Sequence, residues 1–399
     1  MSRVAVTICG IVLLDVVGFG MVLPLMPYIG EVYGASDLQI GMLIACYGLA
    51  QFLAAPWLGN LSDKWGRKPV LALSLVGSAL GFLLWGYDQA ISTFLQPFTS
   101  VPVETLALTV LFVGRTLDGL SGGNLPLAQA VMTDVTDHSS RGRGLALISA
   151  CLGMGFILGP PLGGYLSEGG RYEVPCRLAA LFALLNCLAV LAFLQETKSE
   201  ATRSVRKPTF QGLTELRADL KNILAASAGY FFVYSIFTGT FTLYTLKTFE
   251  MPSGETGNLL GLLAALAVTC QIVFVGRLIR RFGEPLLLKF GLPSVAMCLL
   301  AWGLVREQRE FYLVIAAMAV LASTLNVSLR SRLTKLADPN ETGRLLGYQT
   351  SIESAARVLG PLSGAALMEW GNSHYPGIFA GILLLALLPL LSRSWKVTD

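Results

Sequence analysis

The chain has 399 residues, of which 54% are hydrophobic and only 14% are charged. Soluble proteins carry about 25% charged residues, so this composition excludes a typical water-soluble enzyme or regulatory domain. The net charge of +4 is too small to indicate binding to nucleic acid. The seven cysteines include no CxxC pair and lie mostly in apolar stretches, so we expect no disulfide framework and no metal site.

Apolar stretches long enough to cross about 30 Å of hydrocarbon recur along the whole chain. We predict helical spans at residues 4–29, 39–60, 68–87, 105–133, 143–168, 176–195, 223–248, 257–279, 285–305, 310–336, 344–369 and 376–393. Only helices satisfy their own backbone in lipid without closing a barrel, and these stretches are too long for barrel strands. The sequence therefore predicts an all-α integral membrane protein with twelve transmembrane helices. The first stretch continues past Asp15 to Leu25 without a cleavage site, so we expect it to remain as a span.

Most of the 29 Lys and Arg residues lie in loops on one side of the predicted spans, the side that also holds both termini. The positive-inside rule makes that side cytoplasmic, in a plasma membrane that is the inner membrane if the source is bacterial. The longest charged segment, 197–222, is interpreted as a cytoplasmic linker between a first domain at 1–196 and a second at 223–399. Its basic residues also suit contact with anionic headgroups, although a solvated linker is the simpler interpretation.

The two halves of the chain repeat one another. Three segments of the first half match segments of the second in the same order: 155–163 with 356–364 and 137–143 with 338–344, both offset by 201 residues (159 to 360), and 59–66 with 276–283, offset by 217 (66 to 283). A longer loop around residues 88–103 accounts for the change in offset. We therefore expect two pseudo-symmetric six-helix bundles, a plan in which transporters bind substrate at the interface between the repeats.

A glycine-rich, charged loop joins the second and third predicted spans. It reads Gly59-x-x-x-Asp63-x-x-Gly66-Arg67, where glycines allow a tight turn and the carboxylate lies among cations at a helix end. This loop resembles the signature of the major facilitator superfamily, in which the acidic residue docks against the eleventh span and helps to close the cytoplasmic side. The resemblance assigns these four residues to a conformational gate; a basic turn that only sets topology is the alternative.

Small residues and a proline recur in the fifth predicted span. The pattern Gly155-x-x-x-Gly159-Pro160-x-x-Gly163-Gly164 lets helices pack closely, and the proline bends the helix. It resembles the motif of the antiporter branch of the superfamily. The resemblance implies antiport rather than symport, and ordinary helix packing is compatible with that role.

An acidic residue interrupts the first predicted span. Asp15 begins the run Asp-Val-Val-Gly-Phe-Gly, which is followed by Pro24 and Pro27. The run resembles the first-span signature of the twelve-span drug:proton antiporters, including the tetracycline exporters. A carboxylate inside a span is costly unless it is paired, hydrated or protonated, which suits a proton-coupling residue. A structural acceptor in a kinked helix is the competing interpretation.

The fourth predicted span carries Arg115 and Asp118, three residues apart and thus on one helix face. The segment resembles the Arg-containing fourth-span motif of the superfamily, which is linked there to proton transfer. Asp118 stands where the family more often has an uncharged amide, so it is either a protonation site or the partner that neutralises Arg115. Together with Asp15, these residues are our candidates for proton coupling.

Further candidates lie in other spans. Glu353 and Arg357, four residues apart in the eleventh span, are expected to form a bridge that belongs to the gate. A cavity for amphipathic, partly aromatic compounds needs aromatic and amide residues in its lining. The candidates for that lining are Phe19, Tyr47, Gln51, Tyr234, Phe237, Phe241 and Gln271.

Catalytic motifs are not found in the sequence. The two histidines, His138 and His374, fall in predicted loops, and no GxSxG, HExxH or Walker A sequence occurs. We expect no enzymatic activity, no cofactor and no nucleic-acid partner. The resemblance predicts a secondary transporter, working as a monomer in the lipid bilayer, that exports a small amphipathic compound or drug in exchange for protons by alternating access. A uniporter or symporter of a sugar, organic acid or other metabolite is the main alternative, and a sensor built on a transporter fold is a distant third.

Overall fold

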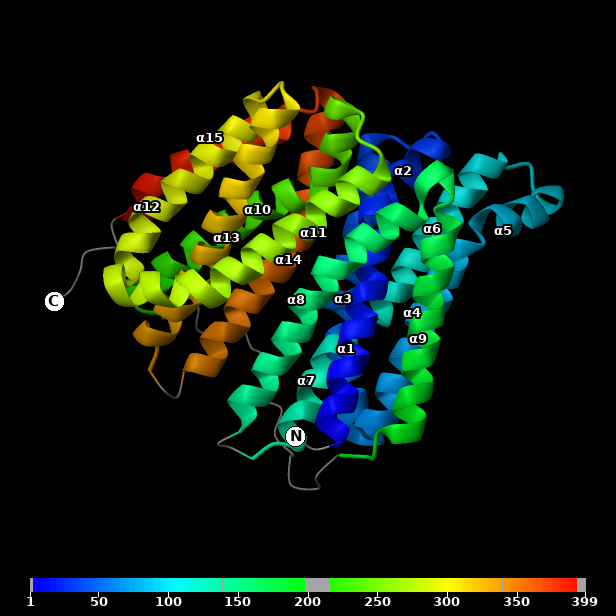
Figure 1. Ribbon diagram of the computed structural model, residues 1–399, viewed down its shortest axis with the longest axis horizontal. Helices are drawn as coiled ribbons and strands as arrows, with labels where there is room; N and C mark the ends of the chain where they lie inside the picture. The colour runs from blue at the N-terminus through cyan, green and yellow to red at the C-terminus, as the bar shows by residue number, and fades with distance from the viewer. Residues whose placement is uncertain (1–2, 138–139, 198–215, 339–340, 393–399) are drawn as a thin grey trace. The chain divides into compact units, whose positions relative to one another are not determined.

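The computed structural model describes residues 3–137, 140–197, 216–338 and 341–392. These residues are almost entirely helical, and none of them forms a β-strand (Figure 1). The helices form two compact units: Met1–Arg203 with Glu250–Leu262, here unit 1, and Ser204–Phe249 with Leu263–Asp399, here unit 2. Most of the predicted linker, residues 198–215, and His138 lie outside the described residues. The predicted domain boundaries remain a prediction.

Unit 1 contains the first six predicted spans. Its helices are α1 (Arg3–Val22), η1 (Leu23–Leu25), α2 (Met26–Val32), α3 (Asp37–Trp65), α4 (Arg67–Gly86), α5 (Asp88–Leu95), η2 (Gln96–Phe98), α6 (Val103–Leu120), α7 (Asn124–Asp134), α8 (Arg141–Leu166), η3 (Glu168–Gly170) and α9 (Glu173–Phe193). The first span is α1 to α2 and continues through Pro24 and Pro27. The fourth span is broken: α6 ends at Leu120 and α7 begins at Asn124.

Unit 2 contains the remaining spans apart from the first part of α11, which belongs to unit 1. The helices that follow the linker are α10 (Ala218–Phe249), α11 (Ser253–Cys270), the π-helix η4 (Gln271–Val275), α12 (Gly276–Leu304), α13 (Gln308–Leu336), α14 (Thr342–Trp370) and α15 (Tyr375–Ser392). We expected a loop between the spans 257–279 and 285–305. The helix instead continues through this region and is interrupted at Gly283, where φ is +73°.

Length and apolar composition identify the membrane crossings. Among the described residues, eight continuous helical stretches are long and apolar enough to span a bilayer. One of them, Ser253–Leu304, has 52 residues, enough for two crossings that meet at Gly283. The broken pair α6 and α7, the more polar α14 and the shorter α15 supply the other three. The prediction of a twelve-span, all-α fold is confirmed.

Helix starts and ends follow local chemistry. At the start of α3, the Ser36 hydroxyl accepts from the Gln39 backbone, and the Gln39 side chain accepts from the Ser36 backbone. This capping box satisfies two donors that no helical carbonyl can reach. The same helix ends at Gly66, whose φ of +103° is readily adopted only without a β-carbon.

The internal repeat is visible in the packing of each unit. In unit 1, α1 packs along α8, and in unit 2, α10 packs along α14. A β-carbon on Gly20 would meet Pro160 at 3.2 Å, and a β-carbon on Gly239 would meet Pro361 at 2.5 Å. A glycine of the first helix therefore lies against the motif proline of the fifth helix in both units.

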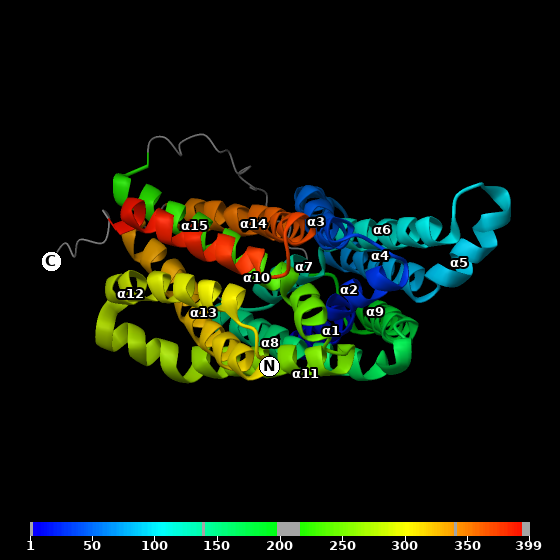
Figure 2. The same ribbon diagram turned by 90° about the horizontal axis from the view of Figure 1, so that it is seen from above.

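Two apolar clusters build the core of unit 1. One contains Ile8 and Val12 of α1, and the other contains Val17 and Met21 of the same helix. In the view from above, α1 runs between α8 and α9, the two helices that cover much of it (Figure 2). Asp15 lies on α1 where the two clusters meet, so the polar site described next is enclosed by apolar packing above and below.

Candidate functional site

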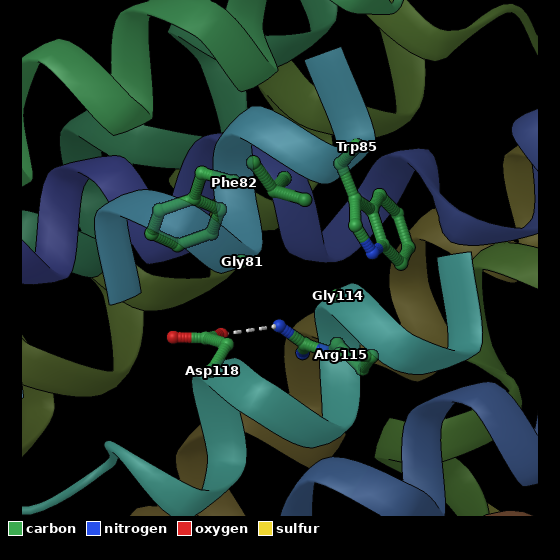
Figure 3. Close-up of a pocket in the computed structure, with 7 residues that line it drawn as sticks. Gly81, Phe82, Trp85, Gly114, Arg115 and Asp118 are labelled. Carbon is green, nitrogen blue, oxygen red and sulfur yellow. Dashed lines mark hydrogen bonds and ion pairs between the residues drawn. The ribbon is translucent and has the colours of Figure 1, made fainter. Parts of the chain in front are cut away.

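Close contact between α4 and α6 brings the charged residues of the fourth span into the interior of unit 1. A β-carbon on Gly81 would meet the carbonyl oxygen of Gly114 at 2.7 Å. This glycine pair lets the two backbones approach. The contact borders a small pocket whose lining residues are Val22, Gly81, Phe82, Trp85, Gly114, Arg115 and Asp118 (Figure 3).

Arg115 and Asp118 form a buried ion pair. Arg115 Nη1 lies 3.1 Å from Asp118 Oδ2, and the two side chains are only 3% and 6% exposed. Figure 3 shows the pair pointing toward each other beneath Phe82 and Trp85 of α4. The three-residue spacing predicted this contact, and the structure contains it.

The guanidinium of Arg115 also lies among aromatic rings. Its Cζ atom is 4.5 Å from the ring centroid of Tyr47, 5.2 Å from that of Phe19 and 6.0 Å from that of Trp85. A cation over an aromatic face is stabilised by the negative potential of the ring. The rings therefore help to hold this cation in the interior of unit 1.

Asp15 is joined to the same region through an amide. Asn124 Nδ2 donates to Asp15 Oδ1 at 2.9 Å and lies 3.5 Å from the hydroxyl of Ser78. The break between α6 and α7 makes Asn124 the first residue of α7 and directs it inward. Asn124 and Ser78 were not predicted from the sequence; the Ser-Gly-Gly run before Asn124 is the signal that could have indicated the break.

The charges of this network are unequal. Asp15 and Asp118 supply two carboxylates, whereas Arg115 is the one guanidinium in the described contacts of the pair. Asp118 is compensated by the cation, and Asp15 receives the neutral amide of Asn124. Asp15 is partly buried, and a second negative charge in such a place without a counter-ion is unfavourable, so the site is suited to accept a proton.

The predicted gate loop contains a charge network centred on Arg67. Its guanidinium lies 2.8 Å from Asp63 and 3.3 Å from Asp134 of α7, and it donates to the Ser62 hydroxyl at 2.6 Å. The loop thus connects α3, α4 and the end of the fourth span. A β-carbon on Gly59 would meet nothing within 4 Å, so close packing within the described residues does not require that glycine.

Glu196, which follows α9, is a further residue that contacts the gate loop, and the sequence did not predict it. Its carboxylate accepts from the backbone N–H groups of Arg67 at 2.7 Å and of Lys68 at 3.2 Å. An anion at this position satisfies free donors at the N-terminus of α4 and complements the helix dipole. A β-carbon on Gly66 would overlap with this carboxylate. Glu196 is 129 residues from Arg67 along the chain, so no local pattern indicated the contact.

The glycines and prolines of α8 pack on two sides. Toward α1, β-carbons on Gly155 and Gly159 would meet Val16 at 2.6 Å and the Val17 carbonyl at 2.8 Å, and one on Gly163 would overlap with the backbone of Met21. Toward α11, Gly164 contacts the Ser253–Gly254 backbone, and Pro160 and Pro161 lie against Gly257 and Gly261. The predicted small-residue packing is present, and all of it lies within unit 1.

A sequence model of the Major Facilitator Superfamily matches residues 8–361, which is most of the chain. The chain belongs to the Major Facilitator Superfamily. It is therefore a multi-pass membrane transporter.

Two relatives within the superfamily are tetracycline resistance proteins, class H from Pasteurella multocida and class C from Escherichia coli. Each is 29% identical to this chain. The alignments cover 97% of this chain and 95% of the class H protein, and 99% of this chain and 98% of the class C protein. The predicted resemblance to the tetracycline-exporter-like branch is confirmed. The solved structure of the human organic anion transporter MFSD10 (TETRAN) has a TM-score of 0.66 at 23% identity, covering 98% of this chain and 99% of that chain, which shows a shared fold.

In this superfamily member, Glu353 of the eleventh span does not have the predicted partner, Arg357. Both carboxylate oxygens of Glu353 accept from Arg330 Nη2 at 2.8 Å. Arg330 belongs to α13, so the bridge joins the tenth and eleventh spans instead of pairing Glu353 with Arg357. Arg330, on the neighbouring helix, contacts both carboxylate oxygens of Glu353. Arg357, four positions along the same helix, does not make this contact in the structure.

The predicted cavity residues of unit 1 lie at the charged site. Phe19 and Tyr47 contact Arg115, and Gln51 donates to the Gly122 carbonyl at 2.7 Å and to the Tyr47 hydroxyl at 3.2 Å. Gln51 therefore holds the break of the fourth span beside the ion pair.

The predicted cavity residues of unit 2 are placed differently. Phe237 packs edge-on against Trp302 at 5.1 Å, Phe241 stacks on Phe311 at 5.8 Å, and Tyr234 stacks on its neighbour Tyr230 at 5.7 Å between ring centroids. These contacts give Phe237 and Phe241 a structural role in the packing of unit 2. Gln271 is exposed and begins the π-helix η4. Their part in a substrate cavity stays a prediction.

Proposed function

We propose that this chain is a proton-coupled exporter of a small amphipathic, partly aromatic compound, and that it works by alternating access. The observation that carries the proposal is the unequal charge of this network: it holds two carboxylates, those of Asp15 and Asp118, and one guanidinium, that of Arg115, which pairs with Asp118. A network of this kind changes its net charge by one when it gains or loses a proton. Such a change, inside apolar packing, is a strong driving force for a conformational switch.

The coupling follows from the contacts of Arg115. When Asp118 is ionised, the guanidinium is held in the pair at 3.1 Å. Protonation of Asp118 removes that attraction, so the guanidinium of Arg115 then interacts only with the aromatic rings around it among its described contacts. Protonation of Asp15 removes the second charge and leaves a hydrogen bond with Asn124. Protons that enter from outside thus change the interactions of Arg115, and substrate competes for the same site.

The substrate class is supported by the site and by the relatives. Phe19 and Tyr47 offer aromatic surface and Gln51 offers an amide beside Arg115, which suits a ligand with both ring systems and polar groups. Two relatives are tetracycline resistance proteins. We therefore expect tetracyclines or compounds of similar chemistry as the cargo.

The cellular setting is proposed together with the function. The basic loops favour cytoplasmic termini, and the bacterial relatives favour an inner membrane. We propose a monomer that needs lipid, protons and the cargo as its partners.

The test is a proteoliposome assay with tetracycline as the probe. Inside-out vesicles with an acidic lumen are expected to accumulate tetracycline, and collapse of the pH gradient is expected to stop accumulation. Each transported molecule should be accompanied by release of protons from the lumen. Accumulation that is indifferent to the gradient would exclude proton antiport, and protons moving with the cargo would favour the symporter alternative.

A further inference from the structure

A short arm projects from unit 1 between the third and fourth spans. It consists of α5 and η2, residues 88–98, and the second half of the chain has a shorter connection at the matching place. In both views α5 extends sideways beyond α4 and α6 and does not continue along their axes (Figures 1 and 2). The arm therefore projects from one end of unit 1.

The arm has an inverted distribution of polar and apolar side chains. Its polar residues Asp88 and Ser92 are 2% and 0% exposed, whereas Phe94 and Phe98 are 70% and 77% exposed. A helix that faces water on its outer side has the opposite arrangement. Leu95 is also exposed, and no charged residue occurs between Gln89 and Val103. The exposed side of the arm is thus uncharged, and it presents Phe94, Leu95 and Phe98 together with the polar residues Gln89, Thr93 and Gln96.

The base of the arm is fixed to unit 1 by hydrogen bonds. Tyr172, in the loop before α9, donates to Asp88 at 3.4 Å and shares a hydrogen bond of 2.7 Å with the hydroxyl of Tyr33 at the end of α2. Burial raises the pKa of Tyr172 to about 12, so its hydroxyl stays protonated and remains a donor. Arg177 stacks on Tyr87, just before the arm, with Cζ 4.4 Å from the ring centroid. The exposed rings are therefore held on an anchored element.

The apolar side of the arm begins where the lipid-facing side of α4 ends. Exposed apolar residues Leu73, Val76, Leu80 and Tyr87 follow one another at helical spacing along α4 and its end. The next residue, Asp88, starts α5. The arm consequently leaves the bundle at the level where a membrane-spanning helix meets the headgroups.

We propose that this arm lies in the headgroup region of one membrane leaflet, with Phe94, Leu95 and Phe98 inserted among uncharged lipid. Helices that lie in the plane of the membrane at this depth bury Phe and Leu side chains at the boundary between headgroups and acyl chains. The absence of basic residues also removes a preference for anionic lipid.

The test places a probe on the arm of the full chain in nanodiscs of phosphatidylcholine. The seven native cysteines are replaced, a thermal unfolding transition like that of the unaltered protein verifies the fold, and a nitroxide is attached to Phe98→Cys. A nitroxide on Gln89→Cys, an exposed polar position at the base of the same arm, is the matched control. The label at 98 should collide more with oxygen than with a water-soluble nickel chelate, and the label at 89 should show the reverse. A label at 98 that prefers the nickel chelate would overturn the proposal, as would spin–spin broadening that reveals a second copy on the arm.

A second variant keeps the test decisive if cysteine replacement prevents folding. Phe98→Trp in the native cysteine background should add fluorescence that is quenched by lipids brominated near the headgroup, whereas Gln89→Trp should not. Exchange of phosphatidylcholine for phosphatidylglycerol should leave the quenching unchanged. A clear increase in the anionic lipid would contradict the choice of uncharged lipid, and absence of quenching in either lipid would refute insertion.

Discussion

Two bends, one in each unit, share a backbone conformation. Gly66, between α3 and α4, has φ +103° and ψ 162°, and Gly283, within α12, has φ +73° and ψ 155°. These two glycines occupy matching positions in the repeated segments 59–66 and 276–283. Only glycine adopts this region readily, so each bend depends on the missing β-carbon.

The charges next to these bends are reversed between the units. In unit 1, Arg67 follows the bend and lies 3.3 Å from Asp134 of the fourth span. In unit 2, Glu284 follows the bend and lies 2.5 Å from Lys335 of the tenth span. Residues 67 and 284 are offset by 217 and residues 134 and 335 by 201, as in the repeated segments. The repeat has therefore kept the bend and the bridge but not the sign of the charges.

The interiors of the two units also share a backbone contact and differ in the side chains beside it. Gly20 and Gly239 contact the equivalent prolines of the fifth helix in each unit. Five residues before them stand Asp15 and Tyr234, so a carboxylate in unit 1 corresponds to an aromatic ring in unit 2. The scaffold is shared, but at this position of the first helix only unit 1 has a carboxylate. Each of the following predictions tests one part of this comparison.

The largest effect is expected from removing the carboxylate of unit 1. Asp15→Asn retains the hydrogen bond to Asn124 but cannot exchange a proton, so gradient-driven tetracycline uptake should fall by at least about tenfold. Tyr234→Phe, at the equivalent position of unit 2, removes a hydroxyl from a predicted cavity residue but no exchangeable carboxylate, so it should leave the dependence of uptake on the pH gradient unchanged. Initial rates in proteoliposomes measure both. Equal losses in the two variants would show that coupling is not confined to unit 1.

The two bends allow a matched stability experiment. Gly66→Ala and Gly283→Ala both place a β-carbon at a strained φ, which costs about 1–3 kcal/mol. The cost should be greater at Gly66, where the new atom also overlaps with Glu196, than at Gly283, where the nearest atom is 3.6 Å away. Thermal unfolding in detergent gives the comparison. The same loss at both sites would show that the Glu196 carboxylate moves aside freely.

The stability of unit 1 should depend on pH through Asp88. Burial raises the pKa of this carboxyl, which is fixed by Tyr172. The folded chain therefore holds a proton that the unfolded chain has released, and the contribution to stability grows as pH falls through the raised pKa toward the ordinary value of about 3.8. Asp88→Asn should lose this dependence. Unfolding temperatures from neutral to acidic pH test it, and parallel curves for the two proteins would contradict it.

The smallest effect is expected at the reversed bridge. Lys335→Glu places two carboxylates together; because Lys335 is 58% exposed but Glu284 only 5%, the loss should lie at the upper end for surface ion pairs, about 1 kcal/mol. The double exchange Glu284→Arg with Lys335→Glu gives unit 2 the sign found in unit 1 and should recover most of that loss. Chemical unfolding of the single and double variants measures the difference. Failure of the double exchange to recover stability would show that the sign of the bridge is fixed by other charges.

The fold was predictable because bilayer thickness sets the length of each apolar stretch. The predicted spans differ from the observed helices mainly at their ends, while the break before Asn124 and the arm helix α5 were not anticipated. The ion pair of Arg115 and Asp118 was predictable because it is local. Contacts of Asn124, Ser78 and Glu196 depend on helices brought together by folding, and no spacing rule reports them. Glu353 shows the same limit: the nearby Arg357 suggested a pair, but Arg330 of another helix is the partner.

The reversed bridge also constrains the mutational paths open to such a chain. If the halves arose by duplication, one of the two bridges had to exchange both of its charges, and exchanging either one alone would have set like charges side by side. A path through an uncharged residue at position 335 avoids that step. The Ser331 hydroxyl donates to Glu284 at 2.7 Å, so the carboxylate keeps a partner along the way. Homologous chains should therefore vary at positions 284 and 335 together, with neutral residues at 335 as the intermediates.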